Sequence, residues 1–394
     1  MAYHGFGRIL DFTKPDQVLL GDFTGGLKDV ATEIPEVRAT LVDAYAKWVE
    51  SADFDGFRID TIKHVEYGFW QTFAPAIRTR LAAEGKKNFM MFGEAFDGDD
   101  VLLGSYTQPG MLDSVFYFSQ HYTAFANVFE NAHLGATQQS GTDQIQTLWD
   151  ARPKNYGTAP QPGGVVGTNA KGEVVGVSPQ KLLVNFIDNH DVDRFLFDSG
   201  GDVPALKNAL TLLYTEDGIP DLYYGTEQNF HGGNDPANRE VLWDTGFDTT
   251  NDTFTYIAKL ARIRRTYAAL RRGDTNVVWS TAHVGTESDA GIFAFERTGG
   301  DAGSSYALVV LNTSESQASS TTNGSSVMQT TLAPNTVLVD VLNAGFPTYT
   351  VDGTGKLNLA VPAMVTPGAN PTQGGPSGYP ARILVPQGEA QTNQ

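Results

Sequence analysis

The stretch Phe54–Val65, FDGFRIDTIKHV, joins a predicted fold element to a candidate chemical group. Apolar residues at helical spacing over Glu36–Val49 predict an amphipathic helix before it, and FDGFRID is typical of a short β-strand. The strand ends at Asp60, and a carboxylate there is costly to bury without partners. Asp60 is therefore either a satisfied structural acceptor or part of a functional site.

The same alternation of strand and helix continues along the chain. A helix is predicted for FWQTFAPAIRTRLAAEG, and a buried strand for NFMMFGEA. Three more strands are predicted for LDSVFYF, LLVNFIDNHD and IPDLYYG, and a helix, ALKNALTLLYTEDG, precedes the last of them. Between Arg152 and Pro179, glycine, proline and small polar residues predict a long surface loop. Polar residues directly after several strands favour a parallel (β/α)₈ barrel over an open sheet. No strand is followed by a glycine-rich phosphate loop, so the sequence gives little support to nucleotide binding.

The pattern changes after ALRRGD, residues 269–274. Short alternating runs such as GIFAFERT, SYALVVLNTS and TVLVDVLN predict antiparallel strands in a β-sandwich, and the tract TSESQASSTTNGSS, Thr313–Ser326, predicts an exposed loop. We place a domain boundary near residue 275.

Composition restricts the classes of partner. The 394-residue chain has a net charge of −18, which argues against nucleic acid and anionic membranes. Solubility explains this charge, and a neutral or cationic substrate or bound divalent cations would also suit it. The absence of cysteine excludes disulfides and thiolate sites. The opening MAYHGFGRIL lacks signal-peptide features, although a truncated form would look the same.

Three acidic residues end three of the predicted strands: Asp60, Glu94 and Asp191. One such carboxylate is readily explained by a structural hydrogen bond. Three of them on different barrel strands favour a common site, because the carboxyl ends of these strands meet at one face. Cleavage of a glycosidic bond requires cooperating carboxyl groups, one ionised and one protonated.

At these residues the chain resembles a known family. GFRIDTIKHV, FGEAFDGD and FIDNHDVDRF are similar, in the right order, to the second, third and fourth signature regions of the α-amylase family, glycoside hydrolase family 13. GIPDLYYGTEQNFHGGNDPANRE resembles the segment at and after the eighth barrel strand, and the β-rich tail resembles the C-terminal sandwich of the family.

The resemblance implies a role for each matched residue. Asp60 matches the nucleophile of a retaining mechanism and Glu94 the general acid/base, a role that requires a carboxyl pKa raised toward neutrality. Asp191 matches the third carboxylate, which binds the sugar hydroxyls at C2 and C3. Arg58 matches the arginine that keeps the nucleophile ionised.

Further matches concern binding of the sugar. His190 matches a histidine that binds the same glucose unit, with a histidine that only satisfies its own loop as the alternative. Lys63 and His64 match a pair that contacts glucose on the leaving-group side. Asp235 and Arg239 match a pair on the donor side, with a loop salt bridge as the alternative.

Calcium is the cofactor that the resemblance implies. GLKDVATEIPEV is similar to the fifth signature region, which makes Asp29 a candidate ligand. The backbone carbonyl at His64 is the second candidate.

The first signature region of the family is absent, and residues 1–35 resemble the end of the excursion between barrel strands three and four. We therefore expect an N-terminally truncated member in which residues 36–275 form strands four to eight of the barrel and residues 276–394 the sandwich. Loss of three barrel strands exposes strand edges. The missing part either belongs to a longer protein or is supplied by another chain.

From the resemblance we expect an enzyme, an endo-acting, retaining hydrolase of α-1,4-glucosidic bonds in starch, glycogen or maltodextrins. Exo-acting α-glucosidase action, glucanotransferase action and an inert fragment that only binds α-glucans are the alternatives. The expected partner is an α-glucan, without nucleic acid or membrane, and the oligomeric state stays open. A polymeric substrate predicts an extracellular parent protein.

Overall fold

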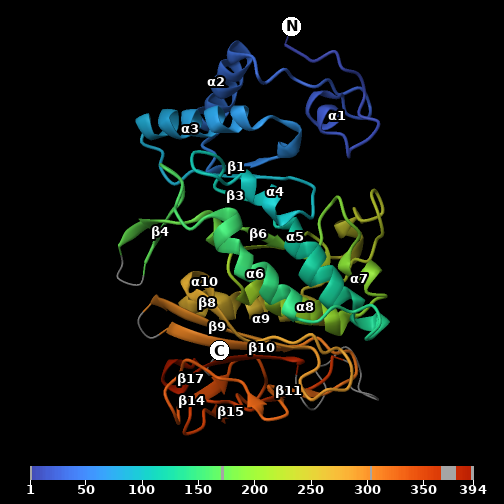
Figure 1. Cartoon of the computed structure of the whole chain (residues 1–394), viewed down its shortest axis with the longest axis vertical. Coiled ribbons are helices and arrows are strands. Elements are labelled where there is room, and N and C mark those ends of the chain that lie inside the picture. Colours follow the sequence, from blue (N-terminus) through green and yellow to red (C-terminus); the bar gives the residue numbers. More distant parts are fainter. Residues whose placement is uncertain (1, 170–172, 302–303, 365–378, 392–394) are drawn as a thin grey trace. The chain divides into compact units, whose positions relative to one another are not determined.

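The computed structural model describes residues 2–169, 173–301, 304–364 and 379–391 (Figure 1). The chain forms two compact units. Unit 1 contains Met1–Ser119, Ala151–Thr168 and Val174–Val184, and unit 2 contains Gln120–Asp150, Asn169–Glu173 and Asn185–Gln394. Among the described residues, no helix combines the length and the apolar character needed to cross a bilayer.

Unit 1 is built on a parallel sheet of three strands in the order β1, β2, β3. Their bounds are β1 (Gly56–Ile59), β2 (Met90–Gly93) and β3 (Ser114–Val115), and Ile59 lies opposite Gly93. Strand β1 is an edge of this sheet. The helices of this unit are α1 (Pro15–Leu20), α2 (Pro35–Ala52), η1 (Ile62–His64), α3 (Tyr67–Ala83), α4 (Asp100–Ser105) and η4 (Pro179–Lys181). The predicted helices and strands of this region are confirmed.

The local sequence explains where these helices begin and end. Helix α2 begins with Pro35 in its first turn, where the missing N–H costs nothing, and ends at Asp53, a left-handed residue whose N–H donates to Val49 O. Helix α3 buries the apolar face that its spacing predicts, including Phe69, Trp70 and Ile77.

Unit 2 combines helices with a large antiparallel sheet. Strand β6 (Val184–Phe186), which begins at the last residue of unit 1, pairs with β7 (Ile219–Asp221). Two of the remaining helices, α5 (Phe118–Gln120) and α6 (Asp143–Tyr156), contain residues of both units. The helices that lie wholly in unit 2 are η2 (His121–Phe129), η3 (Glu130–Leu134), α7 (Phe195–Asp198), α8 (Val203–Thr215), η5 (Thr226–Gln228), η6 (Leu242–Thr245), α9 (Asp252–Thr266), α10 (Ala268–Arg272) and η7 (Gln387–Glu389).

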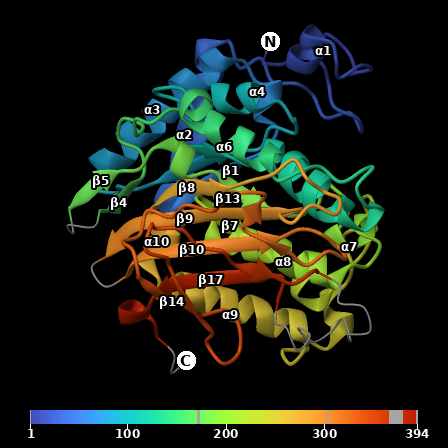
Figure 2. The ribbon, with the colours of Figure 1, turned by 60° about the horizontal axis from the view of Figure 1, so that its bottom comes forward.

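The antiparallel sheet has six strands in the order β15, β14, β17, β10, β9, β8, most of which are labelled in Figure 2. Side chains alternate between two buried clusters. Phe293 and Val309 belong to the cluster shared with α8 and α9, whereas Ala294 and Leu308 belong to a second cluster. The strands are β8 (Asp274–Trp279), β9 (Ile292–Asp301), β10 (Ser304–Asn312), β14 (Val337–Asp340), β15 (Thr348–Thr350) and β17 (Ala381–Pro386).

Two loop predictions were wrong. The segment Arg152–Pro179 begins inside α6 and contains the hairpin of β4 (Val166–Thr168) and β5 (Val174–Gly176). The tract Thr313–Ser326 is not a simple exposed loop. It contributes β11 (Ser319–Ser320), β12 (Thr322–Asn323) and the start of β13 (Ser326–Val327). Strand β11 pairs with β16 (Ala360–Val361), and Thr321 between β11 and β12 is fully buried. Its hydroxyls are satisfied by backbone carbonyls such as Leu357 O, which no composition rule indicates.

Candidate active site

The ends of β1 and β2 place Asp60 beside Glu94 in unit 1. Ile59 and Gly93 are register partners, and the backbone continues this pairing through Glu94 N–H to Ile59 O at 2.7 Å and Ile62 N–H to Glu94 O at 2.8 Å. The two residues therefore follow paired positions on neighbouring strands, one strand spacing of about 4.8 Å apart.

Thr61, directly after Asp60, has a strained backbone that also contacts Glu94. Its φ of 51° and ψ of 37° lie in the left-handed region, where a β-branched residue is an outlier. In this conformation the Thr61 N–H donates to Glu94 Oε2 at 3.0 Å. Strain of this kind costs about 1–3 kcal/mol and is concentrated at functional sites.

The surroundings of the two carboxyl groups differ. The Asp60 side chain is 64% exposed and accepts a hydrogen bond from Arg58 Nη1, whereas Glu94 is only 4% exposed. The Arg58 guanidinium also lies 5.7 Å from the Phe116 ring centroid. A charge-assisted bond from arginine stabilises an ionised carboxylate, so the geometry suits Asp60 as an anion at the open end of the strand.

Lys63 and His64 lie in η1, directly after the strained residue. Lys63 Nζ donates to Phe96 O and lies 3.5 Å from Asp97 Oδ2, so its ammonium group is held by the segment that follows β2. His64 is buried, its Nδ1–H donates to Val18 O at 2.9 Å, and burial lowers its pKa. The side chain of His64 is thus hydrogen-bonded to the N-terminal segment of the chain.

Asp29 lies in a network of its own in the same unit. Its Oδ2 is 2.5 Å from His4 Nδ1, its N–H donates to Asp22 Oδ1 at 3.1 Å, and burial raises its pKa. Oxygen donors of this kind suit calcium, but calcium takes six to eight of them. In the part of the chain that the structure describes, no three histidine or acidic side chains lie together as a metal cluster. Among the described residues, Asp29 is therefore not part of a cluster of three or more such side chains that could hold a metal ion.

The other predicted residues gather in unit 2, around the loop after β6. His190 Nε2 lies 3.1 Å from Asp191 Oδ2, and Arg239 Nη2 lies 3.6 Å from Asp191 Oδ1. Arg239 also donates from Nε to Asp235 Oδ1 at 2.5 Å and from Nη2 to His190 O at 3.2 Å. All four side chains are partly exposed. The structure thus brings Asp191 together with both halves of the predicted donor-side pair.

Beneath this group lies a buried arginine that sequence reasoning did not identify. Arg194 is fully buried and donates to Tyr224 O at 2.8 Å, to Asn238 O at 3.0 Å and to Glu240 Oε2 at 3.2 Å. Its guanidinium carbon lies 3.9 Å from the Tyr223 ring centroid. The only sequence signal was its place in DNHDVDR, because its partners are 29 to 46 positions downstream.

Asp188 is a second buried support of the same loop. Its Oδ2 accepts the Phe195 N–H at 3.0 Å, and burial raises its pKa to about 6. The bond closes the turn that carries His190 and Asp191.

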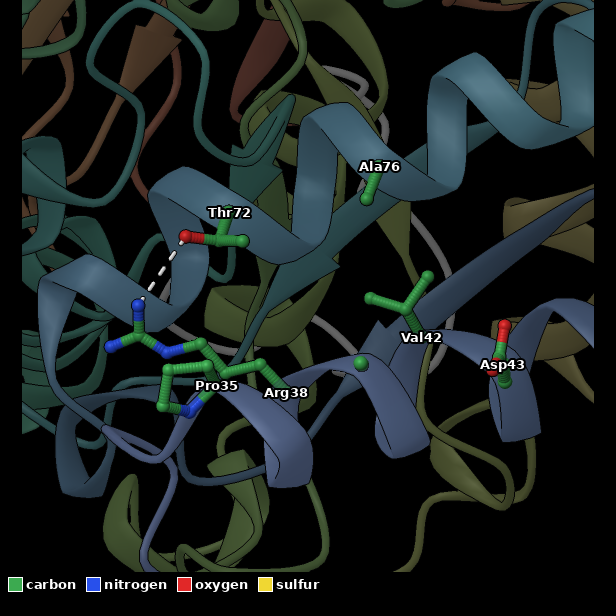
Figure 3. Close-up of a pocket in the computed structure, with 7 residues that line it drawn as sticks. Pro35, Arg38, Val42, Asp43, Thr72 and Ala76 are labelled. Atoms are coloured by element: carbon green, nitrogen blue, oxygen red, sulfur yellow. Dashed lines mark hydrogen bonds between the residues drawn. The ribbon is translucent and has the colours of Figure 1, made fainter.

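A groove of about 380 Å³ lies elsewhere in unit 1, between α2 and α3 (Figure 3). Arg38 reaches across it toward Thr72, with Nη1 3.5 Å from Oγ1. None of the predicted site residues lines it, so we assign it no catalytic role. Its lining residues are Pro35, Arg38, Ala39, Val42, Asp43, Thr72 and Ala76.

Comparison with known proteins identifies the fold. The chain is similar to the crystal structure of an Anoxybacillus α-amylase with a TM-score of 0.73 and 24% identity, covering 98% of this chain and 71% of that one. It is similar to an α-amylase from Geobacillus thermoleovorans, complexed with acarbose, with a TM-score of 0.72 and 23% identity, covering 97% and 71%. The predicted partial barrel with a C-terminal antiparallel β-domain is confirmed.

Comparison of sequences identifies the family. Residues 12–159 match the model of the α-amylase catalytic domain. The chain is 33% identical over 267 residues to α-amylase 1 of Lipomyces kononenkoae, covering 66% of this chain and 36% of that protein. It is 29% identical over 292 residues to a cyclomaltodextrin glucanotransferase of Geobacillus stearothermophilus, covering 74% and 34%. The chain thus spans about a third of the length of these relatives. It belongs to the α-amylase family of enzymes, glycoside hydrolase family 13.

Proposed function

We propose that the chain carries the catalytic groups of a retaining, endo-acting hydrolase of α-1,4-glucosidic bonds in starch, glycogen or maltodextrins. The observation that supports this most directly is the pairing of Asp60 and Glu94 at the ends of neighbouring strands, one exposed and bonded to Arg58, the other buried. Retaining glycosidases place their two carboxyl groups about 5–5.5 Å apart and inverting ones about 6.5–9.5 Å apart. The backbones of Asp60 and Glu94 follow neighbouring strands about 4.8 Å apart, a placement that allows the shorter separation of a retaining pair.

In the proposed mechanism, the Asp60 carboxylate attacks the anomeric carbon and Glu94 gives its proton to the departing glycosidic oxygen. This step forms a covalent β-glycosyl ester on Asp60. Glu94, now ionised, takes a proton from a water molecule, which attacks the ester and releases the sugar with its original α configuration. Arg58 stabilises the Asp60 anion before attack and after release.

The group around Asp191 binds the sugar in this proposal. Asp191 accepts hydrogen bonds from the hydroxyls at C2 and C3, with His190 on the same glucose unit. Arg239 and Asp235, joined at 2.5 Å, contact the neighbouring unit on the donor side. Lys63 and the His64 region contact the leaving sugar.

Calcium belongs to the proposal as a structural ion, with the Asp29 carboxylate and the His64 carbonyl as its ligands. The two groups are oxygen donors, which calcium prefers, and a calcium ion needs several further oxygen ligands beside them. We derive no catalytic step from this ion. We also propose that the parent protein is extracellular, because cells meet polymeric glucans mainly outside.

Glucanotransferase action is the second candidate, because one relative is a cyclomaltodextrin glucanotransferase. In that reaction a sugar hydroxyl replaces water as the attacking group, and the same carboxyl groups serve both reactions. A non-catalytic chain that only binds α-glucans is the third candidate.

The test is release of reducing sugar from soluble starch by the purified chain and by a longer parent protein. Asp60→Asn should abolish release. Asp55→Asn is the matched control, because the Asp55 carboxylate is fully exposed and five residues away. Equal turnover by Asp60→Asn and the wild type would refute the assignment of the nucleophile. Products from labelled maltoheptaose distinguish shortened chains, which indicate hydrolysis, from lengthened or cyclic ones, which indicate transfer.

A further inference from the structure

An exposed aromatic pair stands in the segment 241–248 of unit 2. Trp243, in η6, is 77% exposed and Phe247 is 49% exposed, and their ring centroids lie 5.4 Å apart at an interplanar angle of 86°. Trp243 is the most exposed of the five tryptophans. Single exposed aromatic residues are common, but Trp243 and Phe247 together form a contiguous apolar patch, and such patches mark binding sites.

The pair is held in a well-bonded segment. Gly246 N–H donates to Trp243 O at 3.3 Å and Phe247 N–H to Thr245 Oγ1 at 3.0 Å. At its end, Asp248 O accepts from Gln228 Nε2 at 3.0 Å and from Asn251 Nδ2 at 2.8 Å, and Asn251 caps α9. A ligand that binds here does not have to order the segment first.

Phe247 has a backbone conformation that its side chain disfavours. Its φ is 56°, in the left-handed region, where a bulky residue is rare. The exposed ring recovers little energy from burial within the chain. In this conformation the ring lies against Trp243, and backbone outliers of this kind are concentrated at functional sites.

The aromatic pair follows the donor-side sugar residues directly. Trp243 comes four positions after Arg239, and the intervening Glu240 accepts from Gly232 N–H at 2.6 Å and from Arg194 Nε at 3.2 Å. The segment therefore begins at the buried support of the Asp191 group. The exposed carboxylates of Asp244 and Asp248 disfavour an anionic partner and can accept hydrogen bonds from hydroxyl groups.

We propose that Trp243, supported edge-to-face by Phe247, forms a platform that binds a glucosyl unit of the α-glucan chain next to the unit held by Asp235 and Arg239. A pyranose ring has an apolar face of C–H groups and a rim of hydroxyls. An aromatic ring can stack on the C–H face of the sugar, and nearby carboxylates can accept hydrogen bonds from its hydroxyl groups. The inference takes its substrate class from the proposed function.

Binding of maltoheptaose to the full chain tests the platform. We expect Trp243→Ala to raise the Kd about tenfold and Phe247→Ala to raise it less, in line with aromatic contact energies. Trp48→Ala is the matched control, because Trp48 is 63% exposed in unit 1 and should leave the Kd unchanged. Maltoheptaose should protect tryptophan fluorescence from acrylamide in the wild type and in Trp48→Phe, but not in Trp243→Phe.

Each outcome decides the inference. An unchanged Kd in Trp243→Ala overturns the platform and leaves the hydrolase proposal standing if Asp60→Asn has lost starch hydrolysis. A raised Kd in a chain that releases no reducing sugar supports the platform and counts against the hydrolase. A wild type that does not bind maltoheptaose overturns the platform in this chain. Loss of a dimer in Trp243→Ala, with an unchanged Kd, assigns the surface to a second copy and also overturns it.

Discussion

Replacing Arg194 by methionine should destabilise unit 2 without touching any group proposed to bind sugar. The substitution keeps much of the apolar volume but removes the donors to Tyr224 O, Asn238 O and Glu240 Oε2. Arg194 is fully buried and the Glu240 side chain is 25% exposed. Without Arg194, Glu240 Oε2 loses its cationic partner, and the carboxylate keeps only the N–H groups of His231 and Gly232, which bind Oε1. Breaking a buried pair of this kind costs about 3–5 kcal/mol.

This cost is large compared with the about 5–15 kcal/mol that stabilise a typical folded protein. At about 2–4 °C per kcal/mol for a unit of this size, the thermal midpoint should fall by about 10 °C. Urea unfolding followed by circular dichroism should show a lower midpoint at an unchanged slope, which separates a loss of stability from a change in compactness.

Arg239→Met is the matched control. Arg239 is 45% exposed, so its ion pair with Asp235 should contribute less than about 1 kcal/mol to stability. We expect this variant to unfold like the wild type and to bind maltoheptaose more weakly. If Arg194→Met unfolds within about 1 kcal/mol of the wild type, the buried arginine is not the support that its contacts indicate.

Three further predictions follow from single features. Thr61→Gly should raise the free energy of unfolding by about 1 kcal/mol, because glycine accepts the φ of 51° without a Cβ clash; an unchanged or lower value in urea titration contradicts strain at this position. Burial and the neighbouring Asp202 raise the pKa of Glu315 from 4.5 to about 7, so the folded state retains a proton that the unfolded state has lost; stability should fall as pH rises from about 4.5 to 7. Glu315→Gln should remove this pH dependence and raise the free energy of unfolding above pH 7 by about 1 kcal/mol, a value that allows for the partial exposure of the side chain. The thermal midpoints of the wild type and the variant at pH 5 and pH 8 measure this effect. Chelation of calcium should lower the thermal midpoint if the ion binds through Asp29, and Asp29→Asn should reduce that shift; no effect of chelator argues against a structural ion.

Several elements were predictable because their signals are local. The spacing of apolar residues in α2 and the apolar run of β2 reflect which face of each element is buried, and a few adjacent residues carry that information. The motif around Asp60 likewise predicted a strand end with Arg58 bonded to the carboxylate, two positions apart. The assignment of Asp191 to the same catalytic centre as Asp60 and Glu94 stays a prediction.

Other features depend on residues distant in sequence, and only the tertiary structure decided them. The burial of Thr321 requires Leu357, 36 positions away, and the role of Arg194 requires carbonyls 30 and 44 positions downstream. The exposure of Trp243 is of the same kind, since an aromatic residue in sequence gives no sign of whether a core will cover it. The sequence by itself determined the local elements and the family, because periodicity and short motifs are properties of neighbouring residues. Which polar groups are satisfied, and which aromatic rings stay in water, depended on the packing of segments that folding brings together.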